Sequence, residues 1–127
     1  MAKDKIHYAV RNALKNDGWK ITKDPLTLKS RGVRLMVDLE ASKFLLAEKE
    51  NETIAIEIKS FRNLYVLDDF YSALGQYLCY RLFLDKLGRF TKLYLAITNV
   101  THNRLIKSPL IVDAIQELDI KFITIKG

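Results

Sequence analysis

Residues 54–59 read IAIEIK, an alternation of isoleucine with other side chains. Because successive side chains of a β-strand point to opposite faces of a sheet, this alternation predicts a strand over residues 53–59. The three isoleucines share one face, which we expect to be buried under a helix. The opposite face carries Glu57 and Lys59, and charged side chains are costly to bury without partners. We therefore expect this second face to meet solvent or to line a polar cleft.

The composition of the chain is that of a folded, basic protein. It has 127 residues, of which 49% are hydrophobic, and a formal net charge of +6. This length is typical of one domain with its own core, and the hydrophobic content excludes a disordered chain. The charge is compatible with an ordinary basic protein, and it also favours binding of a polyanion such as nucleic acid. We expect one domain over residues 1–127.

The sequence lacks the signals of secreted, membrane and zinc-binding proteins. The N-terminal stretch is charged, and no apolar run approaches the length of a membrane span. The single cysteine, Cys79, excludes an internal disulfide, and its apolar helical surroundings predict a buried thiol. The two histidines, His7 and His102, are far apart in the sequence, and no Cys/His spacing typical of zinc sites is present. We expect a cytoplasmic protein.

Helix and strand periodicities, separated by turn residues, divide the rest of the chain. Asp4 is expected to cap a first helix, and Ser108 is expected to cap a last helix that begins with Pro109. Breaks are expected at residues 40–42 and 50–52, and a polar loop over residues 98–107. We expect helices over 5–16, 67–87 and 109–118, an extended segment over 19–22, and strands over 26–29, 33–39, 44–49, 53–59, 93–97 and 120–125.

The order of these elements indicates the fold class. The continuously apolar residues 93–97 are typical of a strand that parallel pairing buries on both faces. The strands before the long helix are joined by short turns, as in antiparallel hairpins. We therefore expect an α/β or α+β fold with a mixed central sheet flanked by helices, in the order α-β-β-β-β-α-β-α-β.

The acid and the base of IAIEIK predict a metal-dependent site. Their Cα atoms lie about 6.5–7 Å apart on one strand face, so both side chains can address the same ligand. A carboxylate suits Mg²⁺, and a neighbouring ammonium can orient water or stabilise charge on a phosphate. A second carboxylate would complete such a site, and either Asp38 or Glu48 can supply it. From the spacing alone, an exposed charge pair on an edge strand is the simpler explanation of Glu57 and Lys59.

Polar residues on the long helix extend this prediction. Gln76 and Tyr80 are four residues apart, so they share one helical face, and both can contact a phosphate or a base edge. Arg62 in the preceding loop and Arg81 beside Tyr80 are further candidates for substrate binding. Taken alone, these residues are also compatible with an ordinary amphipathic helix.

An upstream Asp, a strand with E-x-K and a helix with Q-x-x-x-Y resemble the PD-(D/E)xK nuclease superfamily. In this resemblance Asp38 matches the first acid, Glu57 and Lys59 match the (D/E)xK pair, and Gln76 with Tyr80 matches a motif of some branches. The resemblance implies a restriction-endonuclease-like core of a helix, three antiparallel strands, a helix and a parallel strand. It also implies a site that binds Mg²⁺ and cleaves DNA.

A longer resemblance covers nearly the whole chain. Residues 1–22 (MAKDKIHYAVRNALKNDGWKIT), 37–61 (VDLEASKFLLAEKENETIAIEIKSF) and 72–81 (SALGQYLCYR) are similar to the XisH family, the fdxN-element excision controlling factors of cyanobacteria. This resemblance implies an accessory role in programmed excision of a DNA element. It implies two protein partners, a site-specific recombinase and a small protein of the XisI type.

Three hypotheses follow for the function. The first is a Mg²⁺-dependent phosphodiesterase acting on DNA, with metal held by Asp38 and Glu57 and with Glu48 in reserve. The second is a non-catalytic DNA-binding or assembly factor on the same scaffold. The third is a protein-interaction module or homo-oligomer, in which the apolar residues 64–67 form a contact surface or, alternatively, pack in the core.

Overall fold

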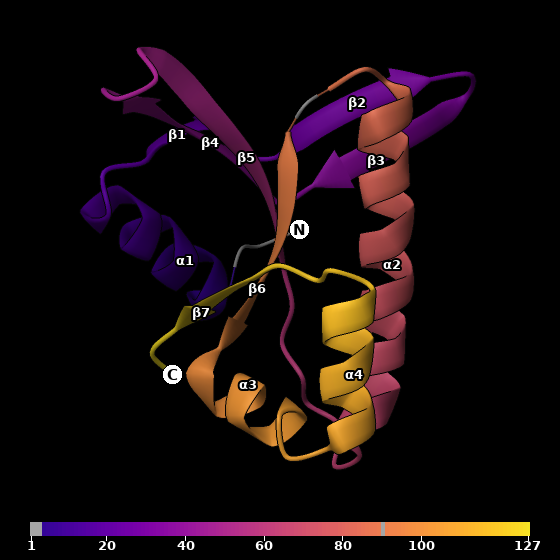
Figure 1. Ribbon diagram of the computed structural model, residues 1–127. Helices are drawn as coiled ribbons and strands as arrows, with labels where there is room; N and C mark the ends of the chain where they lie inside the picture. The colour runs from indigo at the N-terminus through magenta and orange to yellow at the C-terminus, as the bar shows by residue number, and fades with distance from the viewer. Residues whose placement is uncertain (1–3, 90) are drawn as a thin grey trace.

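The computed structural model describes residues 4–89 and 91–127, which form four helices and seven strands (Figure 1). Within these ranges no helix combines the length and the apolar character needed to cross a membrane. In chain order the elements are α1 (Lys5–Asn16), β1 (Lys20–Lys23), β2 (Leu26–Ser30), β3 (Val33–Val37), β4 (Leu39–Leu45), β5 (Glu50–Ile58), α2 (Val66–Lys86), β6 (Lys92–Thr98), α3 (Asn99–Leu105), α4 (Pro109–Glu117) and β7 (Phe122–Ile125).

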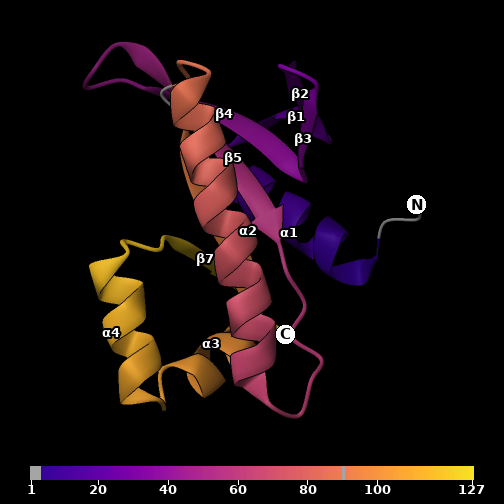
Figure 2. The same ribbon diagram turned by 90° about the vertical axis from the view of Figure 1, so that its right-hand side faces the viewer.

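The centre of the structure is a five-stranded sheet with the strand order β1-β4-β5-β6-β7. The β1–β4 and β4–β5 pairs are antiparallel, whereas β6 pairs in parallel with both β5 and β7. α1 covers one face of this sheet and α2 covers the other (Figures 1 and 2). The chain therefore has the mixed α+β fold, with a central mixed sheet flanked by helices, that the sequence predicts.

The isoleucine face of β5 packs beneath a helix, as expected. Ile54 and Ile56 are fully buried in a cluster with the apolar side of α1. The opposite face is not open along its length, because Ala55 is fully buried in the cluster that contains α2. The polar cleft is therefore restricted to the C-terminal end of the strand, where Glu57 lies.

The chain changes sheets at Asp38, so the expected continuous strand over residues 33–39 is wrong. β3 ends at Val37 and pairs only with β2 in a separate two-stranded hairpin, whereas β4 begins at Leu39 and pairs with β1 and β5. Val37 is buried on the α2 side of the sheet and Leu39 on the α1 side. Asp38 is thus the one residue between β3 and β4, where the chain returns from the hairpin to the central sheet.

The expected break at residues 40–42 is also wrong, because these residues lie inside β4. Glu40 is buried, but its carboxylate has partners: Arg89 Nη2 lies 2.9 Å away and the Thr22 hydroxyl donates to it at 2.8 Å. A paired and hydrogen-bonded carboxylate removes most of the cost of burying a charge in a strand. The two partners are distant in sequence, so they give no local signal.

The connection between β4 and β5 lies earlier than expected. β4 ends at Leu45, residues 46–49 form the turn, and β5 begins at Glu50, so the expected strand over 44–49 is wrong and residues 50–52 are paired. Lys49 has a φ of 54°, a left-handed conformation that ends the turn. The apolar side chain of Leu46, which suggested a strand, is 82% exposed.

Residues expected to form the polar loop over 98–107 mostly form α3. Thr98 caps this helix, since its hydroxyl accepts a hydrogen bond from the Thr101 N–H at 3.2 Å. Thr101 and Leu105, four residues apart, are its buried residues, and the remaining positions are polar except for Val100, which is exposed. Two buried positions are too few to reveal an amphipathic pattern in the sequence.

Other local predictions are confirmed, with one exception. The Asp4 carboxylate accepts from the His7 N–H at 3.1 Å, and the Ser108 hydroxyl accepts from the Ile111 N–H at 3.4 Å, so both are the expected N-caps. Pro109 is the first residue of α4. The exception is Cys79, which is exposed rather than buried, because it lies on the solvent side of α2.

Candidate active site

Two carboxylates meet where the chain changes sheets. Leu39 pairs with Ile56 in the antiparallel β4–β5 ladder, so the next position places Asp38 opposite Glu57. The Asp38 N–H donates to Glu57 Oε1 at 3.3 Å, and the Ile58 N–H donates to Asp38 Oδ2 at 2.8 Å. Each carboxylate is therefore fixed by backbone from the segment that carries the other.

The environment of Glu57 opposes its ionisation. The residue is only 6% exposed. Burial and the negative charge of the neighbouring Asp38 raise the pKa of Glu57 to about 7, even though the ammonium of Lys59 acts in the opposite direction. Two carboxylates in contact in a poorly solvated place are costly to charge together, so this environment favours a proton or another cation beside Glu57.

Lys59 lies on the same side of β5, as the spacing predicts. Its Nζ is 3.5 Å from Glu57 Oε2, and its side chain is 30% exposed. The ammonium therefore lies beside Glu57 on a side chain that partly reaches solvent. In this position it can interact with an anionic ligand that approaches the pair.

α2 brings Gln76 and Tyr80 to the same place. Gln76 Nε2 donates to the Tyr80 hydroxyl oxygen at 2.9 Å. Burial raises the pKa of Tyr80, and the charges of Glu57 and Asp38 raise it further, so the ring lies within electrostatic reach of the acid pair. Gln76 Oε1 is buried and accepts no hydrogen bond from any residue that the structure describes. An orphaned buried acceptor marks a position where water or a ligand donor is expected.

A cavity of about 640 Å³ opens beside Asp38 on the side of α1. Arg62, in the loop after β5, borders it, and the Arg62 guanidinium is exposed with Nη2 3.8 Å from Asp4 Oδ2. His7 and Asp24 also line the cavity, and His7 Nε2 lies 2.9 Å from Asp24 Oδ1. Asp38, one member of the acid pair, thus borders a polar cavity that carries a cation at its edge.

Two of the expected site residues lie elsewhere. Glu48 is in the exposed turn at the opposite end of the β4–β5 hairpin from Asp38, roughly 20 Å away at ~3.4 Å per residue. Arg81 donates to the carbonyl oxygens of Leu118 at 2.8 Å and Asp119 at 3.0 Å. Because Arg81 is one position beyond Tyr80, it projects from a different side of α2 and joins that helix to the end of α4.

A family model described as XisH protein matches residues 1–126. The chain belongs to the XisH family. No protein with a curated description matches it.

Two solved structures resemble this XisH-family chain over almost its whole length. One is an XisH family protein from Nostoc punctiforme PCC 73102, with 34% identity, a TM-score of 0.84, and coverage of 97% of this chain and 91% of the other. The second is an fdxN element excision controlling factor protein from Anabaena variabilis, with 34% identity, a TM-score of 0.83, and coverage of 98% and 92%. The mixed sheet and its flanking helices are therefore shared with XisH structures.

Sequence reasoning missed one polar cluster of this XisH-family chain. Besides contacting His7, the Asp24 carboxylate forms an ion pair with Arg11, and Asp24 and His7 are both buried or nearly so. Arg11 follows His7 by four residues on α1, a spacing that was available as a signal. Asp24 precedes Pro25 in a turn, and nothing in its local sequence indicates that it folds back onto the helix.

Proposed function

We propose that the chain is an accessory factor in programmed excision of a DNA element and that it carries a Mg²⁺-dependent site for cleaving DNA phosphodiester bonds. The observation that carries this proposal is the reciprocal contact of Asp38 with Glu57 beside the Lys59 ammonium. The assignment to element excision is supported by membership of the XisH family and by the name of the Anabaena variabilis protein.

The fold supports assignment to the PD-(D/E)xK superfamily. The order of elements agrees with that of this nuclease core: a helix (α1), antiparallel strands, a second helix (α2) and a parallel strand (β6). Asp38 lies opposite Glu57 near the C-terminal end of β5, and Lys59 follows directly after that strand, which supports matching these three residues to the motif. We propose a restriction-endonuclease-like core on this basis.

The acid pair fits a divalent cation of the Mg²⁺ type. Mg²⁺ in phosphoryl-transfer sites is usually held by one or two carboxylates together with waters and substrate oxygens. Asp38 and Glu57 would supply the two carboxylates. The described residues contain no group of three His, Cys, Asp or Glu side chains suited to a metal, so the other ligands would be waters and substrate oxygens. When bound, such an ion supplies positive charge to a phosphate and lowers the pKa of water.

The remaining residues have roles that follow from their positions. Lys59 would stabilise negative charge on the phosphate, because its ammonium lies beside Glu57 on a side chain that partly reaches solvent. Gln76 and Tyr80 would orient the substrate from α2. Arg62 would contact the DNA backbone at the edge of the cavity. Glu48 and Arg81 have no role in this site, because Glu48 lies at the far end of the β4–β5 hairpin and Arg81 contacts the end of α4.

A second function, DNA binding or assembly without catalysis, is favoured by the small number of acids. A site with two carboxylates and no third acidic or histidine ligand in the described chain can bind a nucleotide backbone without turnover. The net charge of +6 supports salt-dependent binding to DNA under either function. For both functions we propose that a recombinase and a small XisI-type protein are the partners.

Incubation with supercoiled plasmid DNA and Mg²⁺ or Mn²⁺ separates the two functions. A nuclease converts the plasmid to nicked or linear forms, and Lys59→Ala and Glu57→Gln abolish this conversion. Glu50→Gln is the matched control, since Glu50 begins the same strand and is exposed. If the plasmid stays intact while salt-sensitive retardation persists, the non-catalytic function is correct. If neither cleavage nor retardation occurs, both proposals are wrong.

A further inference from the structure

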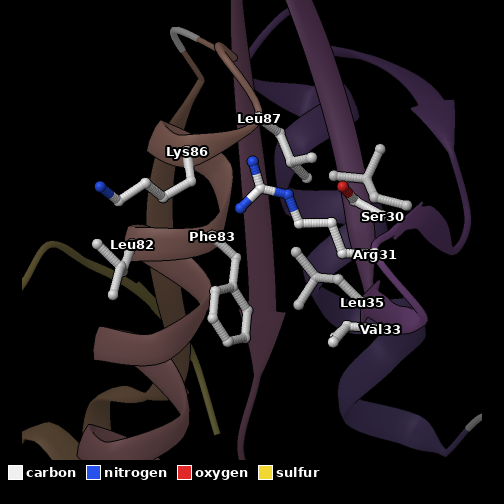
Figure 3. A pocket seen from close by; sticks show the side chains of 9 residues that line it. Ser30, Arg31, Val33, Leu35, Leu82, Phe83, Lys86 and Leu87 are labelled. Atoms are coloured by element: carbon white, nitrogen blue, oxygen red, sulfur yellow. The ribbon is translucent and has the colours of Figure 1, made fainter.

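An apolar groove runs between the β2–β3 hairpin and the C-terminal part of α2, away from the acid pair (Figure 3). Its volume is about 390 Å³. The hairpin contributes Leu28, Val33 and Leu35, and α2 with the residue after it contributes Leu82, Phe83 and Leu87. Val33 and Leu82 are both more than half exposed, so the groove presents apolar surface to solvent.

The groove exists because the hairpin packs on α2 at its base and separates from it at its tip. Leu26 pairs with Val37 at the base, and both are buried in the α2 cluster. Ser30 pairs with Val33 at the tip, on the same face of the hairpin. β2 and β3 pair only with each other in the described sheets, so no further strand supports the tip against the helix.

Cations border the groove. Arg31 and Lys86 line it, none of the lining residues is acidic, and neither cation forms an ion pair with the described part of the chain. Figure 3 shows the Arg31 side chain extending from the hairpin tip across the groove toward Leu87. An apolar floor with unpaired cations at the rim is complementary to a segment that combines apolar side chains with carboxylates.

The backbone at Arg31 supports a role for its side chain. Arg31 and Gly32 form a two-residue turn with φ values of 50° and 76°. Such a turn favours Asn, Asp or Gly at both positions, and another residue in the left-handed region costs about 1 kcal/mol. Strain of this kind is commonly found where the side chain has a function.

Two other occupants fit less well. Phosphates of DNA would pair with Arg31 and Lys86, but they would leave the exposed apolar floor with Val33 and Leu82 uncovered. A second copy can offer acidic and apolar residues only through a different surface, such as the start of α2 with Leu67 and Asp68, which are exposed. That contact is head-to-tail, so it leads to rings or open chains, and the net charge of +6 opposes such assembly.

We propose that this groove is the docking site for an acidic, apolar segment of a different protein. The segment inserts two or more apolar side chains between the hairpin tip and α2, and its carboxylates pair with Arg31 and Lys86. This inference is independent of whether the acid pair cleaves DNA, because it concerns a separate surface of the molecule.

Selection of a displayed library of random peptides against the full chain tests the proposal. We expect the enriched peptides to combine apolar residues with Asp or Glu. Leu82→Asp should weaken their binding at least about tenfold, because it places a charge on the apolar floor. Lys86→Glu should weaken it as well, because it sets an anion against the carboxylates of the peptide. Peptides whose acids are replaced by Lys should bind the Lys86→Glu chain better than the original chain.

Two controls match these substitutions in chemistry and exposure. Lys15→Glu reverses an exposed charge on α1, and Leu110→Asp removes an apolar side chain that is 80% exposed on α4. Neither should change peptide binding, and circular dichroism should show that all four variants are folded. The proposal is wrong if no peptide is enriched, if enriched peptides lack acids, or if the groove variants bind them unchanged. It is also wrong if light scattering shows an oligomer that Leu82→Asp dissociates, since the groove is then a self-interface.

Discussion

Asp38 and Glu57 hold each other in place through the backbone: the Asp38 N–H donates to the Glu57 carboxylate, and the Ile58 N–H, next to Glu57, donates to the Asp38 carboxylate. This arrangement arises because Asp38 is the crossover residue between two sheets and so is free of ladder pairing on its own strand. Two acids are thereby kept in contact in a buried place, at a cost that depends on their protonation.

The first prediction concerns the pH dependence of stability. The pKa of Glu57 is raised from 4.5 to about 7. A raised pKa means that the folded state holds the proton more tightly, so the stabilisation is present below about pH 4.5 and is lost as pH rises to about 7. Over this range the loss is on the order of 3 kcal/mol. Urea unfolding at a series of pH values measures it.

Glu57→Gln should remove this dependence, because an amide does not titrate. We expect the variant to be more stable than the original chain at pH values above about 7 and to show a flatter profile. Glu50→Gln, on the same strand but exposed, should leave the profile unchanged. Mg²⁺ should restore stability to the original chain at high pH and not to the variant. An unaltered profile in Glu57→Gln would show that the pair is not the source of the effect.

The second prediction concerns the ion pair that holds the end of α2 to the sheet. The Glu40 carboxylate is buried and contacts Arg89 and Thr22. Arg89→Met removes its cationic partner and leaves a buried charge with one hydrogen bond, which should lower the free energy of unfolding by about 2–3 kcal/mol. Thermal unfolding measures this, with Arg34→Met on the exposed face of β3 as the control. Equal stabilities of the two variants would contradict the assignment.

Long-range contacts of this kind explain how much of the fold could be predicted from the sequence. The alternation at residues 54–59 and the caps at Asp4 and Ser108 are local patterns, and the structure confirms them. The continuation of β4 through Glu40 could not be predicted, because an acidic residue usually indicates the end of a buried strand. The partner that allows its burial, Arg89, is distant in the sequence.

The candidate site also has residues that local patterns predict and residues that depend on long-range contacts. Asp38, Glu57, Lys59, Gln76 and Tyr80 converge because strand and helix periodicity fix the direction of each side chain, which a sequence reveals. The choice between Asp38 and Glu48 depended on where the hairpin turns, and turn position is set by pairing register rather than by local composition. The sequence predicts Arg81 in the site only because it is next to Tyr80. Neighbouring residues of a helix point in different directions, so Arg81 lies on another face of α2.

The third prediction concerns the loop that carries Arg62. The Asp69 carboxylate accepts from the Asn63 N–H at 2.8 Å and from Asn63 Nδ2 at 2.6 Å, and Arg104 donates to the carbonyl oxygens of Asn63 and Leu64. The hydrogen bond from the Asn63 backbone, with those from its side chain, lowers the pKa of Asp69 below 3.8. A lowered pKa means that the loop contacts are present above pH 3.8 and are lost as pH falls below it.

Hydrogen exchange of the backbone amides at residues 61–65 measures how strongly the Asp69 hydrogen bonds order this loop. Asp69→Asn should speed exchange there at neutral pH while leaving exchange in β5 and β6 unchanged, because the loop is at the surface and the sheet does not depend on it. Asp68→Asn is the matched control, since Asp68 is the neighbouring acid in the first turn of α2. Equal exchange in both variants would show that Asp69 does not order the loop.

The fourth prediction separates stability from binding at the hairpin tip. Arg31 adopts a φ of 50° that Asn tolerates better, so Arg31→Asn should raise the free energy of unfolding by about 1 kcal/mol, as seen in urea unfolding. The same change removes a cation from the groove, so the affinity for acidic, apolar peptides should fall. Lys29→Asn, on the outer face of β2, changes charge identically without occupying a turn position or the groove. It should neither stabilise the chain nor weaken peptide binding. A variant of Arg31 that gains stability and keeps full affinity would show that the strain serves no docking function.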